Sequence, residues 1–322
     1  MSQLPPPSPD PSYVHAPEAS WAQRLLGRFH VTGVFWYRIH RFGVRILPDW
    51  GVGPVILVFT TFFFFSLVKI RGAIASNLEA ILGSCGFVER QRRIWRTMHA
   101  FAWCLSERFE RLVTDRPFEV EVEDAHIWHE IASSGRGFIM VTAHIGNYEV
   151  GSMLPSTEEA RRVHLVREPE GNPEAQAFVQ QLLDEQPGSE HYSWHFQSDS
   201  PLHALPLVHA LQRGEVVAVQ GDRPRTGART VDATLFARPF ELPAGPATLA
   251  RTAQVSILPA FVLREGRRRY RLYFRQPIEA ARTSDRQADL EQVMCRVAEH
   301  IEWAVKQAPH QWFCFRQLWP SS

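Results

Sequence analysis

The distribution of apolar and polar residues divides the chain into two parts of different texture. Residues 51–68 carry no charged side chain, and basic residues flank this run on both sides. Before it, residues 21–42 interleave apolar residues with arginines at roughly helical spacing, and residues 91–112 show another amphipathic helical pattern. From Pro117 onward, short apolar runs typical of strands alternate with helical patterns.

The second part predicts a layered α/β fold. We expect strands at 118–122, 137–142, 163–167, 192–196, 216–220, 256–263 and 270–275. We expect helices at 173–186, 201–213, 244–254 and 287–306. Strands that alternate with helices favour a mostly parallel mixed sheet flanked by helices on both faces. In such sheets, ligands bind at the carboxyl ends of the strands.

The apolar run at 51–68 is short for a membrane span. Eighteen helical residues rise about 27 Å, against a hydrocarbon core of about 30 Å, and Pro54 is expected to shorten the regular helix further. Basic flanks on both sides predict that both ends stay on the cytosolic side. We therefore favour a monotopic or re-entrant helix, with a buried core helix and a true span as the alternatives.

The distribution of charged residues indicates which surface the protein binds and where its domains begin and end. The formal net charge is +1, but residues 20–47 and 90–96 are strongly basic and lie beside apolar stretches. With no nucleic-acid motif in the chain, this pattern indicates an anionic membrane surface and not a nucleic acid. We expect a disordered tail at 1–18, a membrane-associated helical region at 19–116 and an α/β domain at 117–322.

The cysteines indicate neither a disulfide framework nor a metal site. The four lie far apart in the sequence, without the close Cys or His spacing of a zinc site: Cys85, Cys104, Cys295 and Cys314. We therefore expect reduced and mostly buried thiols in a cytosolic protein.

His144 and Glu149 are the leading candidates for catalysis, because they follow the predicted strand 137–142 directly. An offset of five residues turns two side chains about 140° apart on one regular helix. They meet only if His144 lies in the turn before the helix and Glu149 in its first turn. The carboxylate would then hold the imidazole in one tautomer, as a neutral base for a hydroxyl proton. The alternative is a helix cap beside a solvated acid.

Polar clusters at other predicted strand ends supply candidates for substrate binding. Arginines there offer positive charge, and a Gly-Pro turn into a helix offers free backbone N–H groups to an oxyanion or phosphate. The candidates are Arg167, Asn172, Asp222, Arg223 and Gly245. For the arginines, a solvated side chain or an internal ion pair that only shapes a loop is the alternative.

Six motifs together resemble one known family. They are His144–Glu149, Val166–Pro173, Gly221–Arg223, Leu235–Ala247, Ile257–Phe261 and Gln311–Arg316. In this order they resemble the bacterial lipid A biosynthesis acyltransferases of the lauroyl and myristoyl type, within the wider lysophospholipid acyltransferase superfamily. The resemblance runs from about Trp21 to Trp319. One departure is Glu241, where relatives often carry glycine; the acid is expected to narrow or acidify the acceptor pocket.

The resemblance implies a membrane-associated O-acyltransferase. His144 would act as the base on an acceptor hydroxyl, Glu149 would orient it, and a thioester of acyl carrier protein or coenzyme A would be the acyl donor. The acceptor would be a glycolipid, a phospholipid or a related lipid, with no metal or redox cofactor. The expected location is the cytoplasmic face of the bacterial inner membrane, peripheral or monotopic. The alternatives are an inactive lipid-binding or scaffolding protein with this fold, and a thioesterase.

Overall fold

The structure is a computed structural model. It describes residues 42–43, 45–114, 116–148, 161–168, 176–177, 180–181, 191–196, 204–225 and 227–319. The expected disordered tail at 1–18 and most of the arginine-rich stretch that follows lie outside the described residues. Most of the expected helix at 173–186 lies outside them too.

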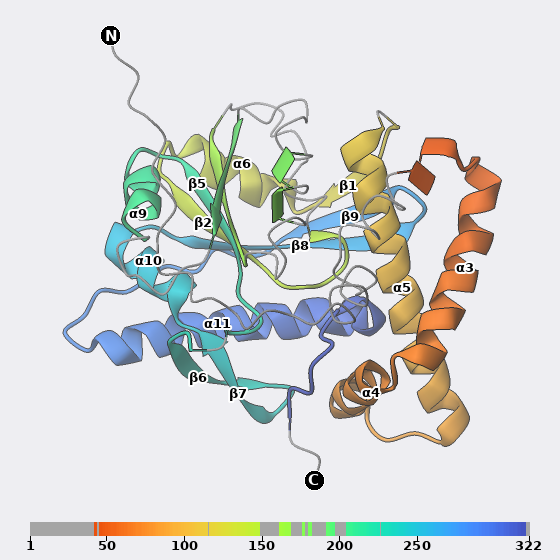
Figure 1. Cartoon of the computed structure of the whole chain (residues 1–322). Coiled ribbons are helices and arrows are strands. Elements are labelled where there is room, and N and C mark those ends of the chain that lie inside the picture. The colour runs from red at the N-terminus through yellow and green to blue at the C-terminus, as the bar shows by residue number, and fades with distance from the viewer. Residues whose placement is uncertain are drawn as a thin grey trace, which may run out of the picture.

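A seven-stranded mixed sheet forms the centre of the protein (Figure 1). Its strands are β1 (Glu119–Glu123), β2 (Phe138–Thr142), β3 (Val163–Arg167), β4 (Tyr192–Phe196), β5 (Val216–Gln220), β8 (Ile257–Gly266) and β9 (Arg269–Phe274). Their order across the sheet is β1-β9-β8-β2-β5-β3-β4. All pairs are parallel except β8 with β9, which form an antiparallel hairpin. The predicted mostly parallel α/β fold is confirmed.

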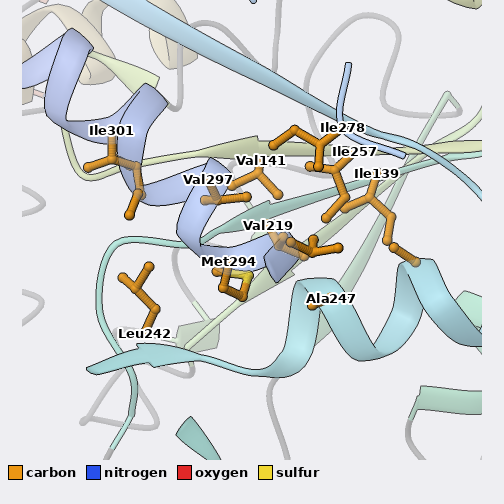
Figure 2. Close-up of a cluster of buried hydrophobic side chains, with 14 of the residues drawn as sticks. Ile139, Val141, Val219, Leu242, Ala247, Ile257, Ile278, Met294, Val297 and Ile301 are labelled. Carbon is orange, nitrogen blue, oxygen red and sulfur yellow. The ribbon is translucent and has the colours of Figure 1, made fainter. Parts of the chain in front are cut away.

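Helices cover both faces of the sheet. On one face lie α9 (Leu205–Gln212), α10 (Gly245–Ala253) and α11 (Arg286–Gln307), and on the other lies α6 (Ala125–Ser133). Neighbouring residues of β2 point to opposite faces. Ile139 packs in the cluster with α10 and α11 (Figure 2). Phe138 packs against α6. Burial on both faces explains why the central strands are continuous apolar runs.

A small hairpin that the sequence pattern did not predict extends from the domain. It consists of β6 (Thr230–Leu235) and β7 (Arg238–Pro243), and it packs on α11. The two residues between the strands, Phe236 and Ala237, both have positive φ angles. Such a two-residue turn normally carries Asn-Gly or Asp-Gly, so Phe-Ala gives no hairpin signal. The backbone conformation of Phe236 is unfavourable for a bulky residue, but its ring packs near Trp312 and Trp319.

In the part of the chain that the structure describes, three helices precede the sheet: α3 (Asp49–Ser66), α4 (Val68–Leu82) and α5 (Phe87–Val113). By length and composition, α3 is long and apolar enough to cross a membrane. It contains Pro54 within its regular helix, so the expected shortening there is wrong. Along one side α3 packs on α5, where buried Thr60 lies 3.3 Å from His99 Nδ1. Much of its remaining surface is exposed and apolar.

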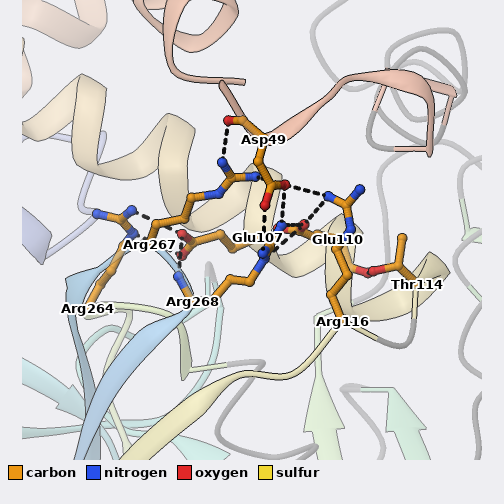
Figure 3. Close-up of polar contacts among 8 residues, drawn as sticks. All are labelled: Asp49, Glu107, Glu110, Thr114, Arg116, Arg264, Arg267 and Arg268. Atoms are coloured by element: carbon orange, nitrogen blue, oxygen red, sulfur yellow. Dashed lines mark hydrogen bonds and ion pairs between the residues drawn. The ribbon is translucent and has the colours of Figure 1, made fainter. Parts of the chain in front are cut away.

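A cluster of charged residues fastens the start of α3 to the α/β domain (Figure 3). The Asp49 carboxylate accepts hydrogen bonds from Arg267 and Arg268, in the turn between β8 and β9, and from Arg116. Arg268 and Arg116 also bind Glu110 at the end of α5. One end of the apolar helix is therefore held by the same hairpin that forms part of the sheet.

A buried polar network joins α5 to the loop after β2. The Glu107 carboxylate, only 1% exposed, accepts two hydrogen bonds from Arg264 at 2.9 and 3.0 Å. It also accepts a hydrogen bond from the Tyr270 hydroxyl. The same hydroxyl accepts a hydrogen bond from the Asn147 side-chain amide. Asn147 donates a second bond to the Cys104 carbonyl on α5. The network therefore links helix, hairpin and loop in the protein interior.

The four cysteines are free thiols, as expected. Cys104 and Cys314 are buried, but Cys85 and Cys295 are exposed, so the expectation of mostly buried thiols is wrong for two of the four. Burial raises the pKa of the Cys314 thiol, despite the nearby Arg223, and this thiol is therefore protonated at neutral pH.

We predict that Glu107→Gln lowers the free energy of unfolding by about 3 kcal/mol, because it leaves the buried Arg264 guanidinium without a counter-charge. Glu121→Gln is the matched control, since Glu121 pairs with Arg271 at 2.8 Å but is 69% exposed. The control should cost less than about 1 kcal/mol. Urea denaturation followed by tryptophan fluorescence measures both, and equal losses would contradict this account of the network.

Candidate active site

The pairing of β2 with β5 brings His144 and Asp222 together. Thr142 and Gln220, the last residues of these parallel strands, are register partners. His144 and Asp222 each lie two residues further along, at the carboxyl edge of the sheet. His144 Nδ1 is 2.7 Å from Asp222 Oδ1, and the Asp222 side chain is fully buried. The His144 side chain is 17% exposed, so solvent reaches part of this side chain.

Three donors converge on the Asp222 carboxylate. Oδ1 faces His144 Nδ1, whereas Oδ2 accepts hydrogen bonds from the His144 backbone N–H at 3.1 Å and from Trp312 Nε1 at 2.9 Å. An ionised carboxylate only accepts hydrogen bonds, so Nδ1 carries the ring proton. This tautomer leaves the lone pair on Nε2, the nitrogen that a base uses.

The electrostatic balance keeps Asp222 ionised. Burial by itself would raise the pKa of this carboxyl group. The interaction with the His144 ring, together with the nearby Arg223 and the Trp312 N–H, outweighs burial and holds the pKa of Asp222 well below its usual range. The buried charge is thus available to stabilise a proton on the His144 ring.

A segment after α11 fixes the loop that carries His144. The Phe313 N–H donates to the His144 carbonyl at 2.8 Å, and Ile145 forms a β-bridge with Trp312. The Gly146 N–H donates to the Gln311 carbonyl at 2.9 Å. The loop backbone therefore pairs with the same segment that supplies the Trp312 N–H to Asp222.

The order of motifs around this site matches one protein family. The model of the bacterial lipid A biosynthesis acyltransferases matches residues 20–321. The chain belongs to this family. It is therefore an acyltransferase of lipid biosynthesis, and the resemblance inferred from the motifs is confirmed.

A search of solved structures finds the 1-acyl-sn-glycerophosphate (LPA) acyltransferase PlsC from Thermotoga maritima. It is 16% identical to this acyltransferase, and the match covers 76% of this chain and 95% of that one, with a TM-score of 0.33. No curated protein matches the chain in a sequence search.

Two of the expected site residues lie outside the described residues: Glu149 and Asn172. The contact of Glu149 with His144 therefore stays a prediction. Arg167 is the last residue of β3, which lies between β5 and the edge strand β4. The Arg167 guanidinium lies 5.5 Å from the ring centroid of Trp194 on β4. Because β3 runs parallel to β5, Arg167 lies at the same edge of the sheet as Asp222.

The structure shows the contacts of Asp222, Arg223 and Gly245, which were expected to bind substrate. The Asp222 side chain has no exposed surface and contacts His144, so it does not present itself to a substrate. Arg223 Nη1 donates to the Phe313 carbonyl at 3.3 Å and lies 3.8 Å from Cys314 Sγ. Gly245 begins α10 and is exposed, and a Cβ there would meet no atom within 4 Å.

Trp312 and the pairing of His144 with Asp222 were missed from the sequence. Both strand ends had been identified, but their side-by-side position in the sheet follows from strand order, which the apolar pattern does not contain. Gly221 carried a usable signal: a Cβ there would lie 2.7 Å from Val141 Cγ1, so glycine allows β5 to end close against β2. Its N–H donates to the Thr142 carbonyl.

We predict that Gly146→Ala lowers acyl transfer by about 100-fold, because it displaces the loop that holds His144. Gly146 has a φ angle of +58°, and a Cβ there would lie 1.9 Å from the Val262 carbonyl oxygen. Gly72→Ala is the control: this glycine lies within α4, and its Cβ would meet nothing within 4 Å. Near-normal turnover by Gly146→Ala in a transfer assay would contradict the role of this turn.

Proposed function

We propose that this acyltransferase moves a fatty acyl chain from a thioester, carried by acyl carrier protein or coenzyme A, to a hydroxyl group of a membrane lipid. His144 is the general base. The observation that carries the proposal is the contact between the partly exposed His144 ring and the buried Asp222 carboxylate at the carboxyl edge of the sheet.

The chemistry follows from the tautomer that Asp222 imposes. The lone pair of His144 Nε2 takes the proton of the acceptor hydroxyl, and the oxygen attacks the thioester carbonyl carbon. Collapse of the tetrahedral intermediate forms the ester and breaks the carbon–sulfur bond, and the imidazolium returns its proton to the leaving thiolate. The Asp222 carboxylate stabilises the imidazolium between these steps, because it is ionised and 2.7 Å from Nδ1.

Glu149 keeps a separate place in this proposal. The sequence predicts that it orients His144, but the structure places Asp222 at the nitrogen on which that role depends. We assign ring orientation to Asp222. Glu149, Arg167, Asn172, Arg223 and Gly245 remain candidates for contacts with the substrates.

We further propose that α3 lies in the membrane surface at the cytoplasmic face without crossing. Both ends of α3 are attached to the α/β domain. At its start, Asp49 binds the β8–β9 turn. After its end, Asn77 of α4 binds the C-terminal segment. Crossing would separate these two attachments by a bilayer. The exposed apolar surface of α3, which includes Val58, Phe62 and Phe65, supports contact with lipid.

We predict that His144→Ala lowers acyl transfer by about 10² to 10⁴, with a moderate fall in the melting temperature because the buried Asp222 carboxylate loses one of its donors. Asp222→Asn should cause a comparable loss, because it removes the charge that stabilises the imidazolium. Glu149→Gln should lose less than either. The assay uses a radiolabelled acyl thioester and counts both acylated lipid and free fatty acid. If Glu149→Gln is inactive while Asp222→Asn retains activity, our assignment of the orienting acid is wrong; release of only free acid would identify a thioesterase.

We predict that protease added to sealed inverted membrane vesicles cleaves the segment before α3, because both flanks of α3 stay on the cytoplasmic side. High salt alone should not release the protein, since burial of apolar side chains contributes about 25 cal/mol per Å² and is not screened by ions. Cleavage within the accessible α/β domain is the positive control. Protection of the segment before α3 would mean that the helix crosses the membrane.

A further inference from the structure

The turn between α4 and α5 exposes large apolar side chains to solvent. We call residues 82–88 the α4–α5 corner. Phe87 is 76% exposed and Val88 is 79% exposed, and Leu82, just before the turn, is 39% exposed. The turn lies at the end of the helical region (Figure 1). Two adjacent apolar side chains with this much exposed surface make the corner a candidate interaction surface.

The local sequence explains why the corner projects. Phe87, Gln91 and Ile94 recur at helical spacing on one face of α5, and Ile94 is buried in the cluster that joins α4 to α5. Phe87 continues that apolar face past the part that α4 covers. Gly83 has a φ angle of +79° and turns the chain out of α4, and its carbonyl accepts a hydrogen bond from Arg93 at 2.9 Å. The corner is therefore a fixed turn.

Basic side chains follow the apolar tip along the first turns of α5. The exposed arginines of the first turns of α5 are Arg90, Arg92 and Arg96. Glu89, the acid among them, is paired with Arg92 at 3.7 Å and with Arg93 at 3.2 Å. An apolar tip followed by cations is the arrangement of segments that enter the boundary between lipid headgroups and acyl chains.

The corner is joined to the exposed surface of α3. On α5, Gln91 lies one turn after Phe87, and its Oε1 accepts a hydrogen bond from Arg71 at 2.6 Å. The Arg71 guanidinium lies 4.2 Å from the centroid of the Phe64 ring, next to the exposed Phe65 of α3. The corner and α3 therefore present apolar side chains from one connected helical unit.

We propose that the α4–α5 corner is a second membrane contact, in which Phe87 and Val88 enter an anionic lipid surface and the arginines behind them bind its phosphate groups. This rests on the proposed action on a membrane lipid. Two adjacent residues and Leu82 offer a small apolar area, whereas a stable protein interface needs about 800 Å² from each partner. The small apolar tip and the cations that follow it on α5 fit a lipid surface better than an acidic protein.

This contact would orient the catalytic edge toward the membrane. Asn77 of α4 donates hydrogen bonds to the carbonyls of Cys314 and Arg316, and it accepts one from the Leu318 N–H. The same segment carries Trp312, whose N–H binds Asp222. A membrane-bound corner therefore holds, through α4, the segment that completes the site.

Two exposed cysteines provide the test, because Cys85 lies in the corner and Cys295 lies on α11. An environment-sensitive fluorophore is attached to Cys85 in a Cys295→Ser background, and to Cys295 in a Cys85→Ser background. Vesicles of phosphatidylcholine, with or without phosphatidylglycerol, are then added to the full-length protein. We expect a blue shift, and quenching by lipids brominated on their acyl chains, at Cys85 with the anionic vesicles. We expect neither at Cys295.

Two double variants separate the apolar and the charged contributions. Phe87→Ser with Val88→Ser should abolish quenching at Cys85 while co-sedimentation through α3 persists. Arg90→Gln with Arg92→Gln should weaken vesicle binding by about fivefold for each arginine, in low salt and only with anionic lipid. Vesicle-bound protein without quenching at Cys85, or protein that binds no vesicles, overturns the proposal. If the fluorophore on Cys85 does not respond to vesicles but acyl transfer is normal, only the membrane contact of the corner is wrong. If His144→Ala retains normal acyl transfer, the proposed function is wrong.

Discussion

The buried carboxylate of Asp222 is the constraint on which the candidate site depends. A charge without solvent contact is costly unless donors surround it, and here the donors are the His144 ring, the His144 backbone N–H and the indole of Trp312. They come from the loop after β2 and from the segment after α11. Satisfying one carboxylate therefore requires three distant parts of the sequence to meet, and their meeting also sets the tautomer of His144.

The strands could be predicted from the sequence because their chemistry is local. Seven apolar or alternating runs gave seven strands, with ends within a few residues of those in the structure. The order β1-β9-β8-β2-β5-β3-β4 is a property of long-range pairing, which no local pattern carries. For this reason the sequence predicts His144 as a base but predicts substrate binding for Asp222, which follows β5 and contacts His144.

Features that break local rules also escaped prediction. The turn at Phe236 and Ala237 has the backbone of a tight hairpin without its usual residues, and tertiary contacts accompany it: Glu302 accepts the Phe236 N–H at 2.8 Å. Pro54 was expected to shorten α3, but it lies near the start of a helix that continues past it. Glu149, which the local pattern does predict beside His144, lies outside the described residues.

The segment from Gln311 to Trp319 follows every strand of the sheet and the long helix α11 in chain order. It nevertheless supplies the Trp312 donor, the strand-like partner of Ile145 and the carbonyl that holds Gly146. During synthesis, the sheet and its covering helices are thus translated before the carboxylate of Asp222 has its full set of donors. The set of donors around Asp222 is therefore complete only once this C-terminal segment has packed beside the loop after β2.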